Sequence, residues 1–160
     1  MRQVSAVHLV ILLAMTWPLR AGAEDLDWTA RNAFYLEARV RAEESDASLR
    51  LLCKSPDVIE VRAGAEELVG MESGKEVTLK LKSGGKQAEL TGIPQPSEDS
   101  QMTGGTELAA RLAPDDPFFA VLLTGKDVAV TGAGRRATWS ARGMKAAVDK
   151  FLGKCKSLSQ

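Results

Sequence analysis

Residues 127–139, DVAVTGAGRRATW, decide which fold class the chain can adopt. Gly132, Gly134 and Ala137 spell G-x-G-x-x-A after a run that predicts a strand, and this spelling is typical of a dinucleotide-binding turn. Such a turn must open a helix inside a strand–helix–strand unit, with an acidic residue about twenty positions further on. Only 26 residues follow Gly134, which is too few to complete that unit.

The residues after the glycines, RRATW, alternate between polar and apolar as a half-buried β-strand does. We therefore predict a β-hairpin with its turn at Gly132 and Gly134, where glycine supplies the positive φ that tight turns need, and we expect no cofactor. Arg135 and Arg136 lie exposed beside this turn. They are the candidate contacts for a partner protein with an acidic surface.

The chain after the hairpin predicts the best helix of the sequence. In ARGMKAAVDKFLGKCKS, residues 141–157, apolar side chains recur at helical spacing on one stripe that includes Cys155. The other cysteine, Cys53, ends an early strand, SLRLLCK, whose alternation turns it toward the core. Two cysteines without CxxC spacing predict one disulfide that holds the helix on the sheet. The alternative, a catalytic thiol, lacks a basic partner.

Period-two alternation predicts several antiparallel strands upstream of the hairpin. The clearest are NAFYLEARV (32–40), VIEVRA (58–63), KEVTLKLK (75–82) and KQAELTG (86–92), and the last two are joined by a Gly-Gly turn. EELVGM (66–71) is a weaker candidate strand. The lysine-rich outer face of the strand predicted at 75–82 is interpreted as a solvated sheet surface.

Residues 92–106 are rich in proline and glycine and predict a long flexible loop, which fits a partner-binding loop and a plain surface loop equally well. ELAARLA (107–113) fits either a strand or one to two helical turns. Asp116 and Pro117 then predict the start of a short buried helix that ends at Gly125. The fold class expected is α+β: an antiparallel β-sheet with a short buried helix and a C-terminal amphipathic helix docked by a disulfide.

The first residues predict export. Arg2 gives a positive start, Val7–Trp17 is an apolar run too short to span a bilayer, and a small-residue cleavage site ends at Ala23. We therefore predict a secretory signal peptide over residues 1–23 rather than an uncleaved anchor. The exported chain, residues 24–160, is then a single periplasmic domain without a membrane span.

Composition excludes several classes of function. The single histidine, His8, falls within the predicted signal peptide. The exported chain therefore has no histidine, which excludes Ser-His-Asp and Cys-His catalysis and metal sites with imidazole ligands. Removing this segment also removes two arginines and no acid, which leaves 19 basic and 21 acidic residues. This near-neutral charge does not indicate a nucleic-acid-binding surface, which would be strongly basic. We therefore expect no catalytic residues, no metal and no cofactor.

The order of the C-terminal elements resembles that of a known family. A cysteine at the end of an early strand is followed by the helix PFFAVLLTGKD, the strands VAVTG and RRATWSARG, and the final helix MKAAVDKFLGKC. This layout is similar to that of the small periplasmic proteins of the TagO type, which are associated with type VI secretion. Trp139 and Gly143 fill the family's aromatic-x-x-x-Gly positions, and Cys53 and Cys155 fill its two cysteine positions.

The resemblance covers the C-terminal half and the two cysteines. It implies a non-enzymatic accessory or binding protein of a secretion-system or envelope complex, with another envelope or secreted protein as its partner. A second hypothesis is an inhibitor or immunity protein against an exported hydrolase, since a rigid disulfide-linked domain binds with little ordering cost. An enzyme that uses carboxylates or Ser/Lys ranks last, and adjacent carboxylates such as Asp115 and Asp116 do not face each other across a site.

Overall fold

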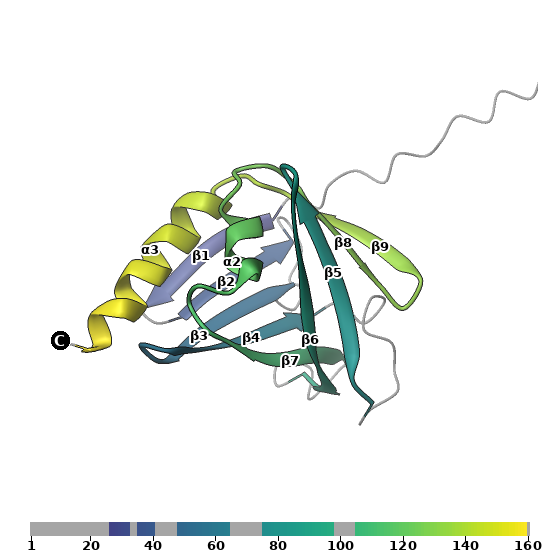
Figure 1. Cartoon of the computed structure of the whole chain (residues 1–160), viewed down its shortest axis with the longest axis horizontal. Coiled ribbons are helices and arrows are strands. Elements are labelled where there is room, and N and C mark those ends of the chain that lie inside the picture. Colours follow the sequence, from purple (N-terminus) through teal and green to yellow (C-terminus); the bar gives the residue numbers. More distant parts are fainter. Residues whose placement is uncertain (1–25, 33–34, 41–47, 65–74, 98–104, 160) are drawn as a thin grey trace, which may run out of the picture.

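The computed structural model describes residues 26–32, 35–40, 48–64, 75–97 and 105–159 of the chain. Within these ranges nine strands form one antiparallel sheet that curls into a half-barrel, and two α-helices accompany it (Figure 1). The predicted α+β class, with its short helix and its docked C-terminal helix, is confirmed. The predicted signal peptide and the candidate strand at 66–71 lie outside the described residues.

The described elements follow one another mostly as antiparallel hairpins. The strands are β1 (Leu26–Asn32), β2 (Tyr35–Val40), β3 (Leu49–Ser55), β4 (Val58–Gly64), β5 (Val77–Ser83), β6 (Lys86–Pro96), β7 (Thr106–Leu112), β8 (Val128–Gly132) and β9 (Arg135–Trp139). The helices are α2 (Pro117–Leu122), α3 (Met144–Lys156) and the 3₁₀ turn η2 (Ser157–Ser159). Across the sheet the order is β1-β2-β3-β4-β7-β6-β5-β8-β9.

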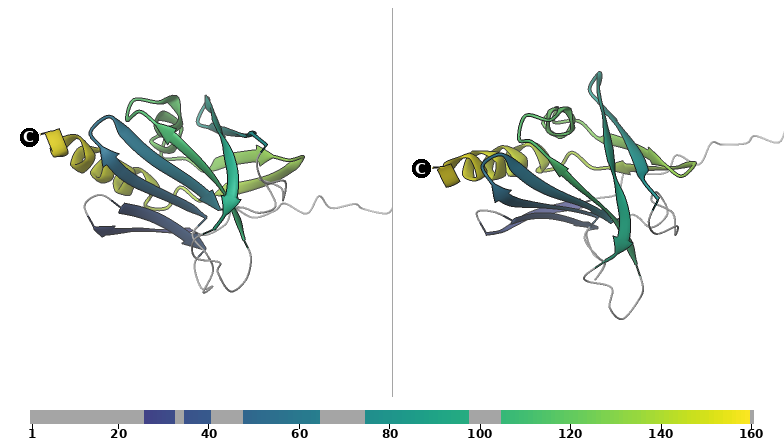
Figure 2. Two further views of the ribbon diagram at one scale, coloured as in Figure 1. Left: turned by 90° about the horizontal axis from the view of Figure 1, so that it is seen from below. Right: turned by 60° about the horizontal axis from the view of Figure 1, so that its bottom comes forward.

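The hydrophobic core lies on the concave side of the sheet, where α2 and α3 cover it (Figure 2). α3 packs on β1 and β2, and α2 packs on β5 and β6. Apolar strand residues such as Leu51 and Leu81 point to this side, as the alternation predicted. The apolar stripe predicted for α3 is confirmed by its buried residues Met144, Val148, Phe151 and Cys155. None of the described helices is long and apolar enough to cross a membrane.

Strand β6 bends the sheet and corrects the loop predicted at 92–106. Its first part, up to Gly92, pairs with β5, and its last part, from Ile93 to Pro96, pairs with β7. The predicted loop is therefore wrong at its start, because β6 continues to Pro96, whereas β7 begins at Thr106, where the loop was expected to end. Residues 98–104 lie outside the described residues. The prolines suggested a loop because they cannot donate to a ladder, but beyond Gly92 the described part of β6 pairs on one side only, which tolerates them.

The predicted hairpin at 127–139 is confirmed as β8 and β9, with one correction to its turn. Gly132 is the last residue of β8 and pairs with Arg135. The positive φ angles fall on the two residues between them, 44° at Ala133 and 74° at Gly134. The turn is therefore Ala133-Gly134, which matches the two-residue hairpin whose central residues both take φ above zero.

The structure also tests the predictions for ELAARLA and for the short helix that follows it. ELAARLA is strand β7, because it completes the sheet between β4 and β6. The predicted start of the short helix is confirmed: the Asp116 carboxylate accepts a hydrogen bond of 2.8 Å from the Phe118 N–H, and Pro117 is the first helical residue. The predicted end at Gly125 is wrong: the helix ends at Leu122 with Leu123 as its C-cap, although Gly125 does take a positive φ of 69°.

Two long-range links close the half-barrel. The predicted Cys53–Cys155 disulfide is confirmed, with Cα atoms 5.6 Å apart, and joins β3 to the last turn of α3. The second link is a hydrogen bond: the indole N–H of Trp28 in β1 donates to the carbonyl oxygen of Ser140 across 3.4 Å. Because Ser140 follows β9 directly, this bond connects the two outermost strands.

Candidate functional site

The outer face of β6, β5, β8 and β9 is polar and carries most of its charge as cations. The strand register places Glu89, Lys80, Thr131 and Arg136 in one row across the four strands. Lys82 lies in the next row, paired with Gln87 and Ala129. The polar residues in these rows point outward because their neighbours along each strand, such as Leu81 and Val130, fill the core.

A shallow groove of about 460 Å³ lies at the β8–β9 end of this face. Its side chains are Thr78, Lys80, Thr131, Arg135 and Arg136, together with the backbone of the turn. We call it the basic groove, because the described residues that line it include three cations and no acid. Glu89 approaches Lys80 only to 3.9 Å, with both side chains more than 60% exposed, so solvent screens this pair.

The two arginines predicted as partner contacts are both exposed, but they leave β9 on opposite faces. Arg136 lies on the outer face in register with Thr131 and Lys80. Arg135 shares the inner-face position of Ala137 and Trp139, and it is exposed because it sits at the tip of the hairpin. The structure therefore brings both residues to one groove from two sides. It adds Lys80, whose alternation in the sequence predicts only a solvated sheet face.

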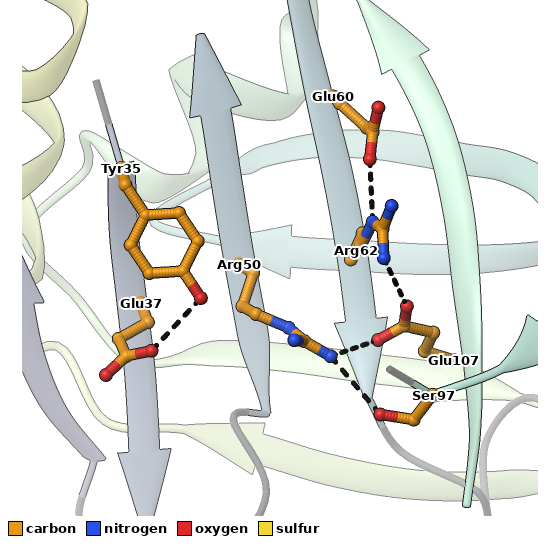
Figure 3. A network of polar contacts seen from close by, with 7 residues as sticks. All are labelled: Tyr35, Glu37, Arg50, Glu60, Arg62, Ser97 and Glu107. Carbon is orange, nitrogen blue, oxygen red and sulfur yellow. Dashed lines mark hydrogen bonds and ion pairs between the residues drawn. The ribbon is translucent and has the colours of Figure 1, made fainter. Parts of the chain in front are cut away.

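A second cluster of charges lies on the outer face of β2, β3, β4 and β7 (Figure 3). We call it the charge network, and its seven residues are Tyr35, Glu37, Arg50, Glu60, Arg62, Ser97 and Glu107. Five of them are buried although they point away from the hydrophobic core: Glu37 is 3% exposed, Arg50 5%, Glu60 9%, Ser97 8% and Glu107 0%. Alternation predicted the direction of these side chains but not their burial.

Glu107 lies at the centre of the charge network and binds two arginines. One carboxylate oxygen accepts a short hydrogen bond from Nη2 of Arg50, and the other accepts from Nη1 of Arg62 at 3.1 Å. Nη2 of Arg50 also donates to the Ser97 hydroxyl at 3.2 Å. Nε of Arg62 donates to Glu60 at 2.6 Å. Three strands, β3, β4 and β7, are thus joined through a single buried carboxylate.

Strand register explains why that carboxylate is needed. Arg50 and Arg62 are directly opposite each other on β3 and β4, and like charges in that position destabilise a sheet. On the other side, Arg50 is directly opposite Glu37 of β2. With Lys54, which lies 3.5 Å from Glu60, the described residues of the cluster include three cations and three carboxylates. Arg50, Arg62, Glu60 and Glu107 bond to one another across three strands, which favours this strand register.

Two members of the charge network have shifted pKa values. Burial, followed by the nearby Glu37 charge, raises the pKa of Tyr35, whose hydroxyl donates to Glu37 at 3.2 Å. Burial also acts to raise the pKa of Glu60, but the hydrogen bond and charge of Arg62, together with Lys54, outweigh it and hold that pKa below its usual value. Tyr35 is therefore kept neutral and Glu60 ionised at neutral pH.

No sequence signal distinguished the charge network from an ordinary solvated face. Arg50, Glu60, Arg62 and Glu107 all occupy alternate positions in apolar strands, as solvent-facing residues also do. Their signs are complementary only once the order of the strands is known. Among the described residues, no group of three or more Cys, His, Asp or Glu side chains is placed to hold a metal ion.

Comparison of the chain with protein-family models, with curated protein sequences and with solved structures gave no match. The resemblance to the TagO-type proteins, and the residues it assigns, therefore stay a prediction. What the protein does is inferred from the two charge clusters: one is internally balanced, and the other, the basic groove, is open to solvent and carries excess positive charge.

Proposed function

We propose that this chain is an exported, non-enzymatic binding protein whose basic groove docks an acidic region of another envelope or secreted protein. The observation that carries the proposal is the convergence of Lys80, Arg135 and Arg136 on one exposed groove, in whose lining the described part of the chain places no acid. Complementary charge of this kind steers association and selects partners. Arginine also binds carboxylates in a bidentate manner, which favours an acidic protein surface as the ligand.

The chemistry of the rest of the described structure supports binding over catalysis. The most buried charged groups, Glu107, Glu37 and Arg50, belong to the charge network and lie outside the groove, and Arg50 is bonded to Glu107. Among the described residues, the groove offers guanidinium, ammonium and hydroxyl groups, which can hold an anion, and no carboxylate or imidazole. The signal peptide predicted over residues 1–23 supports a periplasmic site of action, and the TagO-type layout supports a partner in a secretion-system or envelope complex.

An inhibitor or immunity protein is the second candidate, and the shape of the β8–β9 hairpin favours it. The hairpin projects at the side of the molecule opposite the C-terminus of α3 (Figure 1). A projecting, hydrogen-bonded hairpin with arginines at its tip could enter the acidic active-site cleft of a hydrolase. Inhibition of a co-purifying hydrolase would separate this role from a purely accessory one.

Charge reversal tests the proposed function. The variant K80E/R136E should lose partner proteins that wild type retains from an envelope extract after cross-linking, because two groove cations become carboxylates. The control K126E/K150E makes the same change in net charge at exposed lysines outside the groove and should retain those partners. If both variants retain the same proteins as wild type in quantitative mass spectrometry, the groove is not the docking site.

A further inference from the structure

Strand β9 forms one edge of the sheet. It is the last strand in the order and has β8 as its only strand neighbour among the described residues. Figures 1 and 2 both show it at the outer margin of the molecule, away from α3. An edge strand presents backbone donors and acceptors in a row, and such a row is a template for one more strand.

The register identifies which backbone groups face the open side. The two-residue turn makes Gly132 and Arg135 the closing, mutually hydrogen-bonded pair of the hairpin. Because hydrogen-bonded pairs alternate along an antiparallel ladder, Ala137 and Trp139 also bond to β8. The N–H and C=O groups of Arg136 and Thr138 therefore point away from β8, toward the open edge.

The side chains around the edge select what can pair there. Arg136 and Lys80 carry positive charge on the outer face, and Arg135 carries it at the tip on the inner face. On the inner face, Ala137 is half-buried beside the fully buried Trp139. A strand placed beside β9 would therefore meet cations at its outward positions and a small apolar surface at its inward positions.

We propose that the acidic partner adds an extended segment to the sheet as a tenth strand along β9, with acidic residues outward and apolar residues inward. This mode of docking rests on the proposed function and specifies its geometry. A second copy of the chain fits the same edge less well, because it would bring four arginines from two β9 strands to one short seam. Like charges at such a seam oppose pairing.

Amide hydrogen exchange on wild-type protein tests the pairing directly. The probe is a ten-residue peptide that alternates Glu with Val. In its presence, exchange of the Arg136 and Thr138 amides should slow at least tenfold, because these N–H groups become donors to the added strand. The Ala137 amide, already bonded to β8, serves as the internal reference and should change much less. Unchanged exchange at Arg136 and Thr138 in a peptide-saturated sample would overturn the proposal.

A matched peptide separates strand pairing from simple charge attraction. Its composition and charge are the same, but alternate residues on one edge are N-methylated, which removes their N–H donors. It should bind at least tenfold more weakly by fluorescence anisotropy. Equal affinity would overturn strand addition while leaving the basic groove as an acidic-partner site. Failure of both peptides to bind, or dimerisation of the chain through β9 in sedimentation analysis, would also overturn it.

Discussion

Glu107 is the single residue whose charge matters most for the sheet. Glu107→Gln removes the anion between Arg50 and Arg62 and leaves these two cations opposite each other, largely shielded from water. Removing one member of a buried charged set costs about 3 kcal/mol. We therefore expect the free energy of unfolding, measured with urea, to fall by about 3 kcal/mol.

The control for this prediction is an exposed ion pair. Lys145 and Asp149 are 2.6 Å apart on α3, with both side chains about half exposed. Asp149→Asn should lower the free energy of unfolding by less than about 0.5 kcal/mol, because solvent already screens that pair. A loss of similar size in Glu107→Gln and Asp149→Asn would show that Glu107 does not anchor the charge network.

Ala133 is the residue whose backbone is least suited to its place. It takes a φ of 44° at the first turn position of the β8–β9 hairpin, where a Cβ atom costs about 1 kcal/mol. Asn-Gly is the preferred pair for this turn. Ala133→Asn should therefore raise the free energy of unfolding by about 0.5–1 kcal/mol in a urea titration. A decrease would mean that the turn is not built as described.

Among the elements, β6 depends on one glycine at its bend. A Cβ at Gly92 would lie 2.2 Å from the carbonyl oxygen of Ala109 in β7, which is backbone and cannot rotate away. Gly92→Ala should therefore force β6 and β7 apart and lower the free energy of unfolding by about 2 kcal/mol or more. Circular dichroism during thermal unfolding would report the loss.

The same substitution elsewhere in the chain should have the opposite sign. Gly153 lies on the exposed side of α3, and a Cβ there would meet no atom within 4 Å. Gly153→Ala should stabilise the protein by about 0.5–1 kcal/mol, because alanine favours the helix. If Gly92→Ala were as well tolerated as Gly153→Ala, the close approach of β6 to β7 would be contradicted.

Elements were predictable from sequence where alternation and turn chemistry agreed. The hairpins β5–β6 and β8–β9, the start of α2 and the apolar stripe of α3 followed from local pattern alone. Strand β1 is not among the predicted strands, although LDWTARN alternates, and the strand predicted for β6 ends too early because Pro94 and Pro96 are typical of a loop. In both cases the deciding interaction was pairing with a neighbouring strand, which local pattern does not contain.

For the whole molecule, the order of strands carries the information that the sequence pattern lacks. Lys80 joins the basic groove only because β5 lies beside β8, and Glu107 meets Arg50 and Arg62 only because β7 lies beside β4. Residue type and alternation predict that Arg136 points outward, but they do not predict which residues of the adjacent strands lie beside it. The disulfide was different, because two cysteines in the whole chain left a single intramolecular pairing to consider.

That disulfide spans 102 residues and ties the last helix to an early strand. A loop of this size contributes about 4 kcal/mol or somewhat more by restricting the unfolded chain. The double variant C53S/C155S should therefore fold with a free energy of unfolding about 4 kcal/mol lower, because α3 keeps its apolar contacts to the core. The Ser55 carbonyl oxygen lies 3.4 Å from Sγ of Cys155 and can accept from the new hydroxyl.

Reductant provides the matched control for the double variant. Wild type in reductant should unfold at the same urea concentration as C53S/C155S, whereas the variant itself should not respond to reductant. Mass spectrometry of unreduced wild type should show a Cys53–Cys155 cross-link and no alkylated thiol. Two alkylatable thiols, or a urea midpoint that reductant does not move, would contradict the link, and α3 would then be held on β1 and β2 by packing alone.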